Sequence, residues 1–194
     1  MTDLSAVILA GGRSSRMKTD KAELELSGKR FIDILTYKLL SMGISDIMIS
    51  GYERPVARTR YIPDIYPGKG PLSGIHAGLN AAAWTKVLFV AVDTPLIPVS
   101  FLEKIAAAHT NGITAAECGG ILQPMTAVYD KQLCAECDAF IKADKLKVRE
   151  LMQKTGYKTI TFEGNELLIR GCNTPEEYRQ LKEYALTSED VSGM

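Results

Sequence analysis

The sequence predicts an α/β protein, a single Rossmann-like doubly wound domain whose sheet is mostly parallel with antiparallel additions. Two observations carry this prediction. Continuous apolar runs alternate with segments of helical spacing along most of the chain, which is typical of parallel strands covered by helices on both faces. The length of 194 residues suits one such domain. We expect it over residues 1–187, followed by a polar tail over 188–194.

The first half of the chain alternates strand and helix patterns clearly. Residues 4–10 are an apolar, β-branched run closed by Gly11-Gly12, which indicates a buried parallel strand. Residues 31–42 carry leucine and isoleucine at helical spacing, with Gly43 as a C-cap. The same reasoning predicts strands over 44–50, 60–62 and 86–92, and helices over 72–84 and 98–109.

The pattern loosens in the second half. Gly119-Gly120 is a hairpin turn signal. Thr174, Pro175 and Glu177 together make a capping box with proline at the first helical position, so a helix begins there. The other elements that we expect are short strands over 113–117, 121–123 and 125–129, helices over 130–143 and 147–154, and a strand over 157–162.

Composition excludes several functional classes. The 23 lysines and arginines are balanced by 23 acidic residues, so a general binder of nucleic acid or anionic membranes, which needs a basic surplus, is not expected. No apolar stretch reaches the roughly 18 residues of a spanning helix. The N-terminus lacks the charged and then apolar pattern of a secretory signal. We therefore expect a cytoplasmic protein without nucleic-acid or membrane partners.

The four cysteines do not form a metal-binding pattern. Cys134 and Cys137 make a CxxC pair, but no second pair or histidine stands at ligand spacing. Positions three apart share one face of a helix, so burial explains the pair more simply. We expect neither a zinc site nor a disulfide.

Two segments after predicted strands have the composition of ligand sites. Residues 11–21, after the first strand, hold two glycines and four cations against one carboxylate, which favours phosphate binding over an ordinary solvated turn. The spacing matches neither GxxxxGK[ST] nor GxGxxG. Asp93 follows the strand over 86–92, where a carboxylate can hold Mg²⁺ facing phosphates, although a turn aspartate is an equal alternative.

A third segment follows the short strand over 60–62. Asp64 precedes a loop rich in glycine and proline, residues 66–74, which enters a helix. Such a loop can wrap a planar base with main-chain groups, or it can be an ordinary surface loop. In open α/β sheets ligands bind beyond the carboxyl ends of the strands, so all three segments belong to one expected site.

Five blocks of sequence carry a resemblance to a known family. LAGGRSSRMKTDK, GPLSGIHAGL, VAVDTPLIP, LQPMTAVY and NTPEEY occur in this order between Leu9 and Tyr178, and together they are similar to the molybdenum cofactor guanylyltransferases. The resemblance implies a fold of the nucleotide-diphospho-sugar transferase type. It further implies Mg²⁺-dependent transfer of GMP from GTP to molybdenum-molybdopterin, with release of pyrophosphate. Molybdoenzyme-specific chaperones are an implied partner class.

The resemblance also implies roles for individual residues. Arg16, Lys21 and Asp93 would be catalytic, and Asp93 would also hold the metal. For the acceptor we expect Arg149 near Gln123-Pro124, and the resemblance adds Asn173, whose block the capping box explains equally well. The residues implied in nucleotide binding are Leu9, Ala10, Gly11, Gly12, Lys21, Asp64 and Asp93.

The chain departs from the family pattern at four positions. Lys18 stands in place of glycine, and Arg30 in place of proline. Ser50 replaces an asparagine that contacts nucleotide, and Gly171 reduces a pair of asparagines to one. The resemblance therefore does not carry the nucleotide contact of that asparagine over to Ser50. Because one asparagine of the pair is missing, the resemblance implies the nucleotide site more strongly than the acceptor site.

Two other functions remain open from the sequence. One is a related nucleotidyltransferase that uses CTP or acts on a sugar-phosphate or polyol-phosphate acceptor. The other is a non-catalytic nucleotide-binding module. The presence of both Lys21 and Asp93 argues against the module, because binding alone does not need a metal carboxylate.

Overall fold

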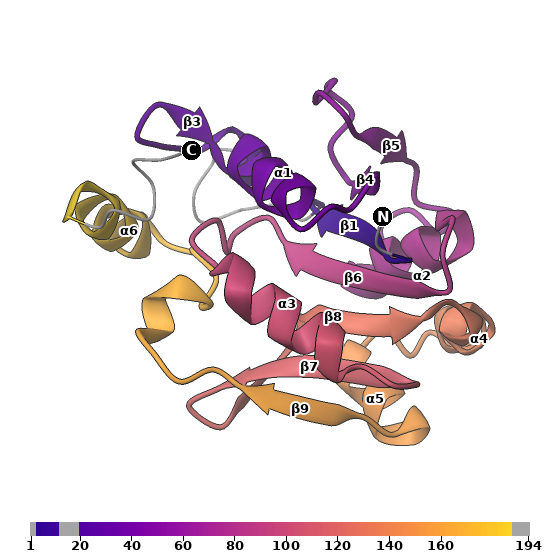
Figure 1. The fold of residues 1–194 in the computed structure, drawn as a ribbon. Helices are drawn as coiled ribbons and strands as arrows, with labels where there is room; N and C mark the ends of the chain where they lie inside the picture. Colours follow the sequence, from indigo (N-terminus) through magenta and orange to yellow (C-terminus); the bar gives the residue numbers. More distant parts are fainter. Residues whose placement is uncertain (1–2, 12–19, 188–194) are drawn as a thin grey trace.

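The computed structural model describes residues 3–11 and 20–187 (Figure 1). Its centre is a sheet with the strand order β5-β4-β1-β6-β8-β7-β9, in which β8 runs antiparallel to both neighbours and the other strands are mutually parallel. The strands are β1 (Ser5–Leu9), β4 (Asp46–Ser50), β5 (Arg60–Ile62), β6 (Lys86–Ala91), β7 (Ile113–Cys118), β8 (Ile121–Asp130) and β9 (Lys158–Thr161).

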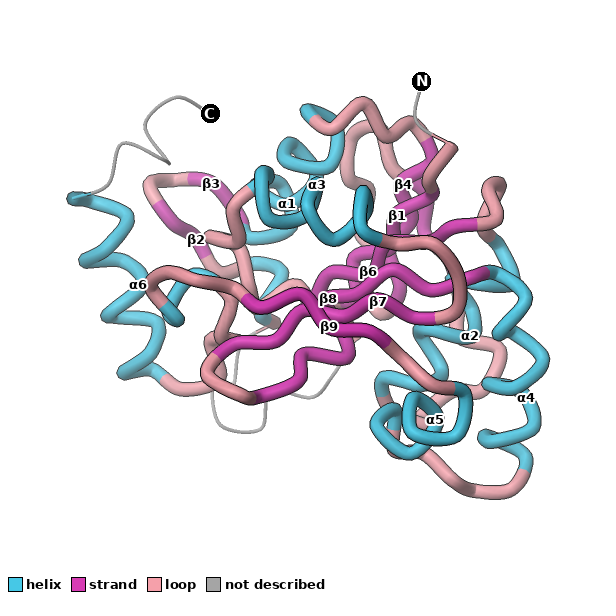
Figure 2. The backbone as a smooth tube through the Cα atoms, turned by 60° about the horizontal axis from the view of Figure 1, so that its bottom comes forward, coloured by secondary structure: helices cyan, strands magenta, loops and turns pink. Residues whose placement is uncertain are grey.

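Helices cover both faces of the sheet, which confirms the predicted doubly wound α/β fold (Figure 2). One face is covered by α1 (Phe31–Ser41) and α3 (Val99–Ala108), with α6 (Pro175–Thr187) beside a small hairpin. The other is covered by α2 (Pro71–Ala81), α4 (Cys134–Lys142) and α5 (Val148–Thr155). Within the described ranges no helix is both long and apolar enough to span a membrane.

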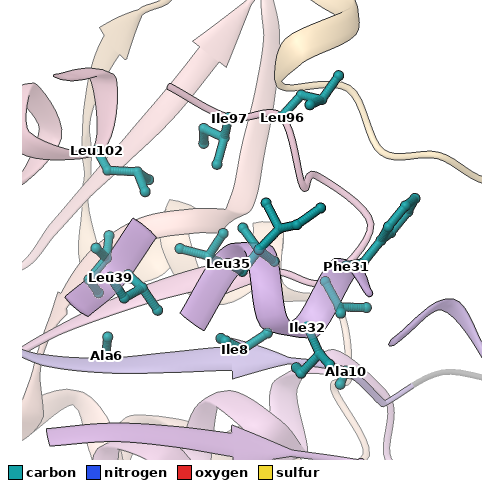
Figure 3. Close-up of a cluster of buried hydrophobic side chains, with 14 of the residues drawn as sticks. Ala6, Ile8, Ala10, Phe31, Ile32, Leu35, Leu39, Leu96, Ile97 and Leu102 are labelled. Carbon is teal, nitrogen blue, oxygen red and sulfur yellow. The ribbon is translucent and has the colours of Figure 1, made fainter. Parts of the chain in front are cut away.

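The core is divided by β1, whose successive side chains point to opposite faces. Ala6 and Ile8 belong to the cluster under α1 and α3, whereas Val7 and Leu9 belong to the cluster under α2. This alternation with apolar residues on both faces is what a central parallel strand requires. Figure 3 shows the first cluster, with Ala6, Ile8, Ala10, Phe31, Ile32, Leu35, Leu39, Leu96, Ile97 and Leu102 labelled.

The second half differs from the prediction at one strand. Residues 121–123 and 125–129 form a single strand, β8, rather than two. The pairing with β7 shifts between Ala115, opposite Ala127, and Ala116, opposite Gln123. Pro124 lies in the resulting irregularity, as expected for a residue that has no N–H to donate to a sheet ladder.

Two local elements also differ from the prediction. The helix expected over 130–143 begins as a short 3-10 turn, η2 (Lys131–Leu133), before α4. The hairpin of β2 (Glu25–Leu26) and β3 (Lys29–Arg30) was not predicted. Its turn residues Ser27 and Gly28 have φ values of 50° and 76°, which is the conformation of a tight hairpin turn.

Two glycines of helix α2 allow its backbone to pack directly against the sheet. A Cβ atom on Gly78 would lie 2.7 Å from Phe89 Cε1 and from Val7 Cγ2. A Cβ atom on Gly74, one turn earlier, would lie 2.9 Å from Leu9 Cδ2 and from Ser50 Oγ. The first turn of α2 therefore packs directly against the carboxyl ends of β1 and β4.

Candidate active site

The candidate site is built where β1, β4 and β6 end side by side. Leu9 accepts a hydrogen bond from the N–H of Val92 at 3.0 Å, and Ala10 donates to the carbonyl of Ser50 at 2.9 Å. The chain therefore leaves the sheet from three neighbouring strands at one edge. Because β4 and β6 lie on opposite sides of β1, this edge is the switch point at which ligands bind in open α/β sheets.

Gly11 and Gly51 bring two of these turns into direct contact. Gly51 has φ of +81°, and a Cβ atom there would lie 2.2 Å from the Cα of Gly11. A side chain at position 51 is therefore excluded by both its conformation and its neighbour. Gly11 itself is exposed, so its main chain is accessible to a ligand, which the expected contact with nucleotide requires.

Lys21 lies between two oxygen atoms from distant parts of the chain. Its Nζ is 2.8 Å from Asp93 Oδ2 and 2.7 Å from Asn173 Oδ1. The side chains of Lys21 and Asp93 are 16% and 18% exposed, so the pair is shielded and still reachable. Lys21 starts a short 3-10 turn, η1 (Lys21–Glu23), which Asp20 caps by accepting from the N–H of Ala22.

Gly171 gives the Asp93 carboxylate the room that it occupies. A Cβ atom at position 171 would lie 2.7 Å from Asp93 Oδ2 and 2.9 Å from Asp93 Cγ. The next residue, Cys172, donates its N–H to the Asp93 carbonyl at 2.9 Å. The glycine that departs from the family pattern thus lies against the predicted metal carboxylate.

Asn173 belongs both to the site and to the capping box, the two explanations that the sequence left open for its block. Its Nδ2 donates to the carbonyl of Gly171 at 2.9 Å while its Oδ1 accepts from Lys21. Glu177 Oε2 accepts from the N–H groups of Asn173 and Thr174, and Thr174 Oγ1 accepts from the N–H of Glu177. The capping box that starts α6 therefore also fixes Asn173 beside Lys21.

Asp64 is held at the same edge of the sheet by Ser50. Ser50 Oγ donates to Asp64 Oδ1 at 2.9 Å, and Ser50 is the last residue of β4. A serine at this position therefore orients the aspartate that we expect to contact the nucleotide. Sequence reasoning missed this pair, because Ser50 ends one predicted strand, Asp64 follows another, and no motif joins them.

The other predicted residues lie elsewhere or outside the described part. Gly12 and Arg16 fall outside the described residues. Arg149, on α5, donates from Nη2 to the carbonyl of Leu122 at 3.0 Å. Leu122 precedes Gln123 and Pro124 in β8, so Arg149 lies next to the segment with which it was expected, whereas Asn173, the other residue expected at the acceptor, lies beside Lys21.

The thiol beside the cluster is not set up as a nucleophile. Cys172 is buried, and burial raises its pKa to about 11. The thiol is therefore protonated at neutral pH, although Lys21 lies nearby. The four cysteines are free thiols in the structure, and burial raises the pKa of Cys137 to about 12.

The donor set around Lys21 suits a divalent cation of the magnesium type. Oxygens of Asp93 and Asn173 both accept hydrogen bonds from one cationic atom, the Nζ of Lys21, and the Asp93 carboxylate fills the room that the missing side chain of Gly171 provides. The described residues contain no group of three or more histidine, cysteine or acidic side chains that could enclose a metal. Mg²⁺ typically binds through one or two carboxylates plus water and substrate phosphates, so Asp93 fits it.

Fold and site together define the class of this protein. A parallel sheet presents exposed main chain after β1, a lysine, and a carboxylate after β6 at one edge. This arrangement is typical of an α/β protein that binds a nucleotide and works on its phosphates.

The chain belongs to the family described as the MobA-like NTP transferase domain, whose model matches residues 6–159. It is therefore a nucleotidyltransferase. A protein from Peptoclostridium acidaminophilum named "Probable molybdenum cofactor guanylyltransferase" is 36% identical over 91% of this chain and 87% of its own length. The molybdenum cofactor guanylyltransferase of Vibrio atlanticus is 33% identical over 92% of this chain and 95% of its own.

Solved structures with the same fold include several nucleotidyltransferases. Molybdopterin-guanine dinucleotide biosynthesis protein A from Archaeoglobus fulgidus matches with a TM-score of 0.77 at 20% identity, over 95% of this chain and 100% of that one. The 2-C-methyl-D-erythritol 4-phosphate cytidylyltransferase of Thermus thermophilus matches with a TM-score of 0.74 at 16% identity, over 96% of this chain and 100% of that one. Mycobacterium tuberculosis Rv0371c in complex with manganese matches with a TM-score of 0.71 at 14% identity, over 94% of this chain and 98% of that one.

Proposed function

We propose that this protein transfers GMP from GTP to the terminal phosphate of molybdenum-molybdopterin and releases pyrophosphate. The observation that carries the proposal is the cluster of Lys21, Asp93 and Asn173 at the edge of the sheet where β1 ends in the exposed main chain of Gly11. The names of the relatives from Peptoclostridium acidaminophilum and Vibrio atlanticus support the choice of GTP and of the molybdenum cofactor as substrates.

The reaction needs charge control more than proton transfer. An oxygen of the acceptor phosphate attacks the α-phosphorus of GTP, and the bond from that phosphorus to the pyrophosphate oxygen breaks. The acceptor oxygen is already anionic, so no general base is required. The protein must align two anions and stabilise the charge that develops on the transferred group and on pyrophosphate.

In this proposal Lys21 supplies a fixed positive charge and Asp93 supplies a metal site. The Lys21 ammonium, held by two oxygens, faces the nucleotide phosphates. Mg²⁺ at Asp93 would neutralise phosphate charge as the pyrophosphate leaves. The manganese complex of the Mycobacterium tuberculosis neighbour supports the use of a divalent cation. Arg16, outside the described residues, is proposed to face the same phosphates.

The nucleoside and the acceptor occupy separate parts of the proposed site. The main chain of residues 9–12 and the Asp64 carboxylate contact the guanine nucleotide. Arg149, with Gln123 and Pro124, lies on the acceptor side, which Asn173 borders. We further propose a cytoplasmic protein that passes its product to molybdoenzyme-specific chaperones.

A cytidylyl transfer is the alternative that the fold leaves open, since a cytidylyltransferase shares it. The names of the guanylyltransferase relatives favour GTP over CTP. The segment 70–74 enters α2, where Leu72, Ser73 and Gly74 are buried, so we propose that the exposed residues before Leu72 contact the base through their main chain. A site whose main-chain groups pair with guanine rejects a pyrimidine, because those groups are then left without partners.

The test is a competition between labelled GTP and CTP. Both are supplied at equal concentration with Mg²⁺ and molybdenum-molybdopterin, and the dinucleotide product and pyrophosphate are measured. We expect guanylyl product in large excess. Predominant cytidylyl product would overturn the assignment of GTP, and the absence of pyrophosphate release with any of the four NTPs would overturn the proposed reaction.

A further inference from the structure

The loop between β5 and α2 is tied to a helix from the second half of the chain. The hydroxyl of Tyr66 donates to Asp138 Oδ1 of α4 at 2.5 Å. The Nζ of Lys69 lies 2.7 Å from Asp144 Oδ1, just beyond the end of α4. Both contacts join residues more than 70 positions apart, so no sequence motif reveals them.

Tyr66 is fixed at its ring and its main chain as well as at its hydroxyl. Its ring lies against the imidazole of His76, with centroids 5.3 Å apart. Its carbonyl accepts from Ser73 Oγ at 2.7 Å. His76 is 5% exposed, and its buried Nδ1 has no hydrogen-bond partner among the described residues. Burial lowers the pKa of His76, so the ring behind Tyr66 is neutral.

Asp138 is a strong acceptor with both oxygens engaged. Asp138 Oδ2 lies 2.7 Å from Lys142 Nζ, one turn along α4, while Oδ1 accepts from Tyr66. The hydrogen bonds from Lys142 and Tyr66 lower the pKa of Asp138, which is therefore ionised at neutral pH. A hydrogen bond from a neutral hydroxyl to an ionised carboxylate is stronger than one between neutral groups.

The same loop reaches the candidate site at both of its ends. Asp64, two residues before Tyr66, is bonded to Ser50. Gly74, at the start of α2, lies against Leu9 and Ser50. The ends of the loop are thus fixed at the site, and its middle is fixed to α4.

We propose that Asp138 is a positioning residue for nucleotide binding, which acts through Tyr66 to hold the loop of residues 65–70 in the shape that receives the guanine base. This inference rests on the proposed function. A loop that is ordered before the ligand arrives spares the ligand the cost of ordering it, which raises affinity and selectivity. Affinity for the triphosphate part depends on Lys21 and not on this loop.

The test separates the base from the phosphates by using two ligands. Binding of GTP and of inorganic tripolyphosphate, each with Mg²⁺, is measured by calorimetry for wild type, Tyr66→Phe, Asp138→Ala and the double variant. Tyr66→Phe keeps the ring against His76 and removes the hydroxyl alone. We expect each variant to bind GTP about 10- to 100-fold more weakly, the scale of one charge-assisted hydrogen bond, and tripolyphosphate as wild type does.

The double variant and two further variants test whether Asp138 acts through the hydroxyl of Tyr66. If Asp138 acts through Tyr66, the double variant binds GTP no more weakly than the single variants. Asp138→Asn keeps an oxygen acceptor for the hydroxyl and should restore most of the GTP affinity. Glu136→Ala removes another carboxylate from α4 and serves as the matched control, with GTP binding unchanged.

Each remaining outcome contradicts the inference. Wild-type GTP affinity in both single variants would show that the contact does not position the loop. An equal loss for GTP and tripolyphosphate would show a general structural role. A wild-type protein that binds tripolyphosphate but not GTP would overturn the proposed function, and this inference with it.

Discussion

Asp93 joins three parts of the chain that are far apart in sequence. It follows β6, pairs with Lys21 after β1, and packs against Gly171 before α6. The positions after buried strands left a metal carboxylate and a turn aspartate as equal alternatives for Asp93 and made Lys21 one of four cations in the segment 11–21. The family resemblance then singled out both residues. Their contact with Asn173 was not predictable, because the capping box accounts for NTPEE without any site.

Asp93→Asn should leave the fold intact and remove most activity. The substitution keeps the volume but deletes the charge that a metal needs, and the loss of such a contact typically costs about 10²- to 10³-fold in rate. Turnover is measured together with Mn²⁺ binding by electron paramagnetic resonance. Glu183→Gln, an exposed carboxylate change on α6, is the control. Wild-type turnover and Mn²⁺ affinity in Asp93→Asn would refute the metal assignment.

His76 should make the protein less stable in mild acid. Its pKa is lowered by burial, so as pH falls below about 6.5 the unfolded chain takes up a proton that the native state does not. Stability then falls by up to about 1.4 kcal/mol per pH unit until the lowered native pKa is reached. Asp138 and Lys142 also face this ring and partly offset one another.

Urea unfolding at pH 7.5 and 5.5 checks this expectation. Wild type should lose more stability between these two values than His76→Phe, which keeps an aromatic ring against Tyr66 but cannot titrate. Other ionisable groups are common to both proteins, so the difference reports on His76. Equal losses in the two proteins would contradict the expectation.

At the scale of elements, the continuous apolar strands were the easiest to predict. Residues 4–10 and 86–92 read as buried strands because helices cover both faces of the sheet. The β2–β3 hairpin was missed because each strand has two residues, too few for any periodicity. The single β8 was missed because Pro124 ended the pattern, whereas in the structure the proline lies in an irregularity of the pairing.

Gly78→Ala should destabilise the protein although alanine favours helices. The new Cβ atom would meet Phe89 and Val7 at 2.7 Å, and both residues are fully buried. Overpacking of this kind costs about 1–3 kcal/mol, which exceeds the gain of about 1 kcal/mol or less in helix propensity. Asn80→Ala, at an exposed position of the same helix, is the control and should be neutral or stabilising. The measurement is the denaturant midpoint of unfolding for wild type and both variants. An unchanged midpoint for Gly78→Ala would mean that α2 can move away from the sheet.

At the scale of the whole molecule, the site is a contact between the two ends of the chain. Its described residues extend from Leu9 to Asn173, and the cluster at Lys21 spans 152 positions. The doubly wound topology was predictable from alternation, and it explains why residues after β1 and β6 meet. The hydrogen bond between Tyr66 and Asp138 of α4 depends on how α2 and α4 pack. The local pattern of apolar residues in the sequence does not determine that packing.

A ligand bound across these segments should stabilise the molecule as a unit. GTP with Mg²⁺ at about 100 times its dissociation constant should add about 2.7 kcal/mol to the unfolding free energy. The measurement is the thermal midpoint with and without ligand. Lys21→Ala should show a much smaller increase at the same GTP concentration, whereas Lys158→Ala, a change beside Thr110, should match wild type. An equal increase in Lys21→Ala would remove that lysine from the nucleotide site.

The central position of β1 has a consequence for synthesis on the ribosome. This strand is made before the other strands of the sheet, but its neighbour β6 is made about 80 residues later, and Gly171 and Asn173 follow later still. The β7–β8 hairpin, by contrast, pairs residues close in sequence and can form as soon as it emerges. The nascent chain therefore carries an unfinished sheet until β6 and its partners have been made, and the cluster at Lys21 is complete only after Asn173 has emerged.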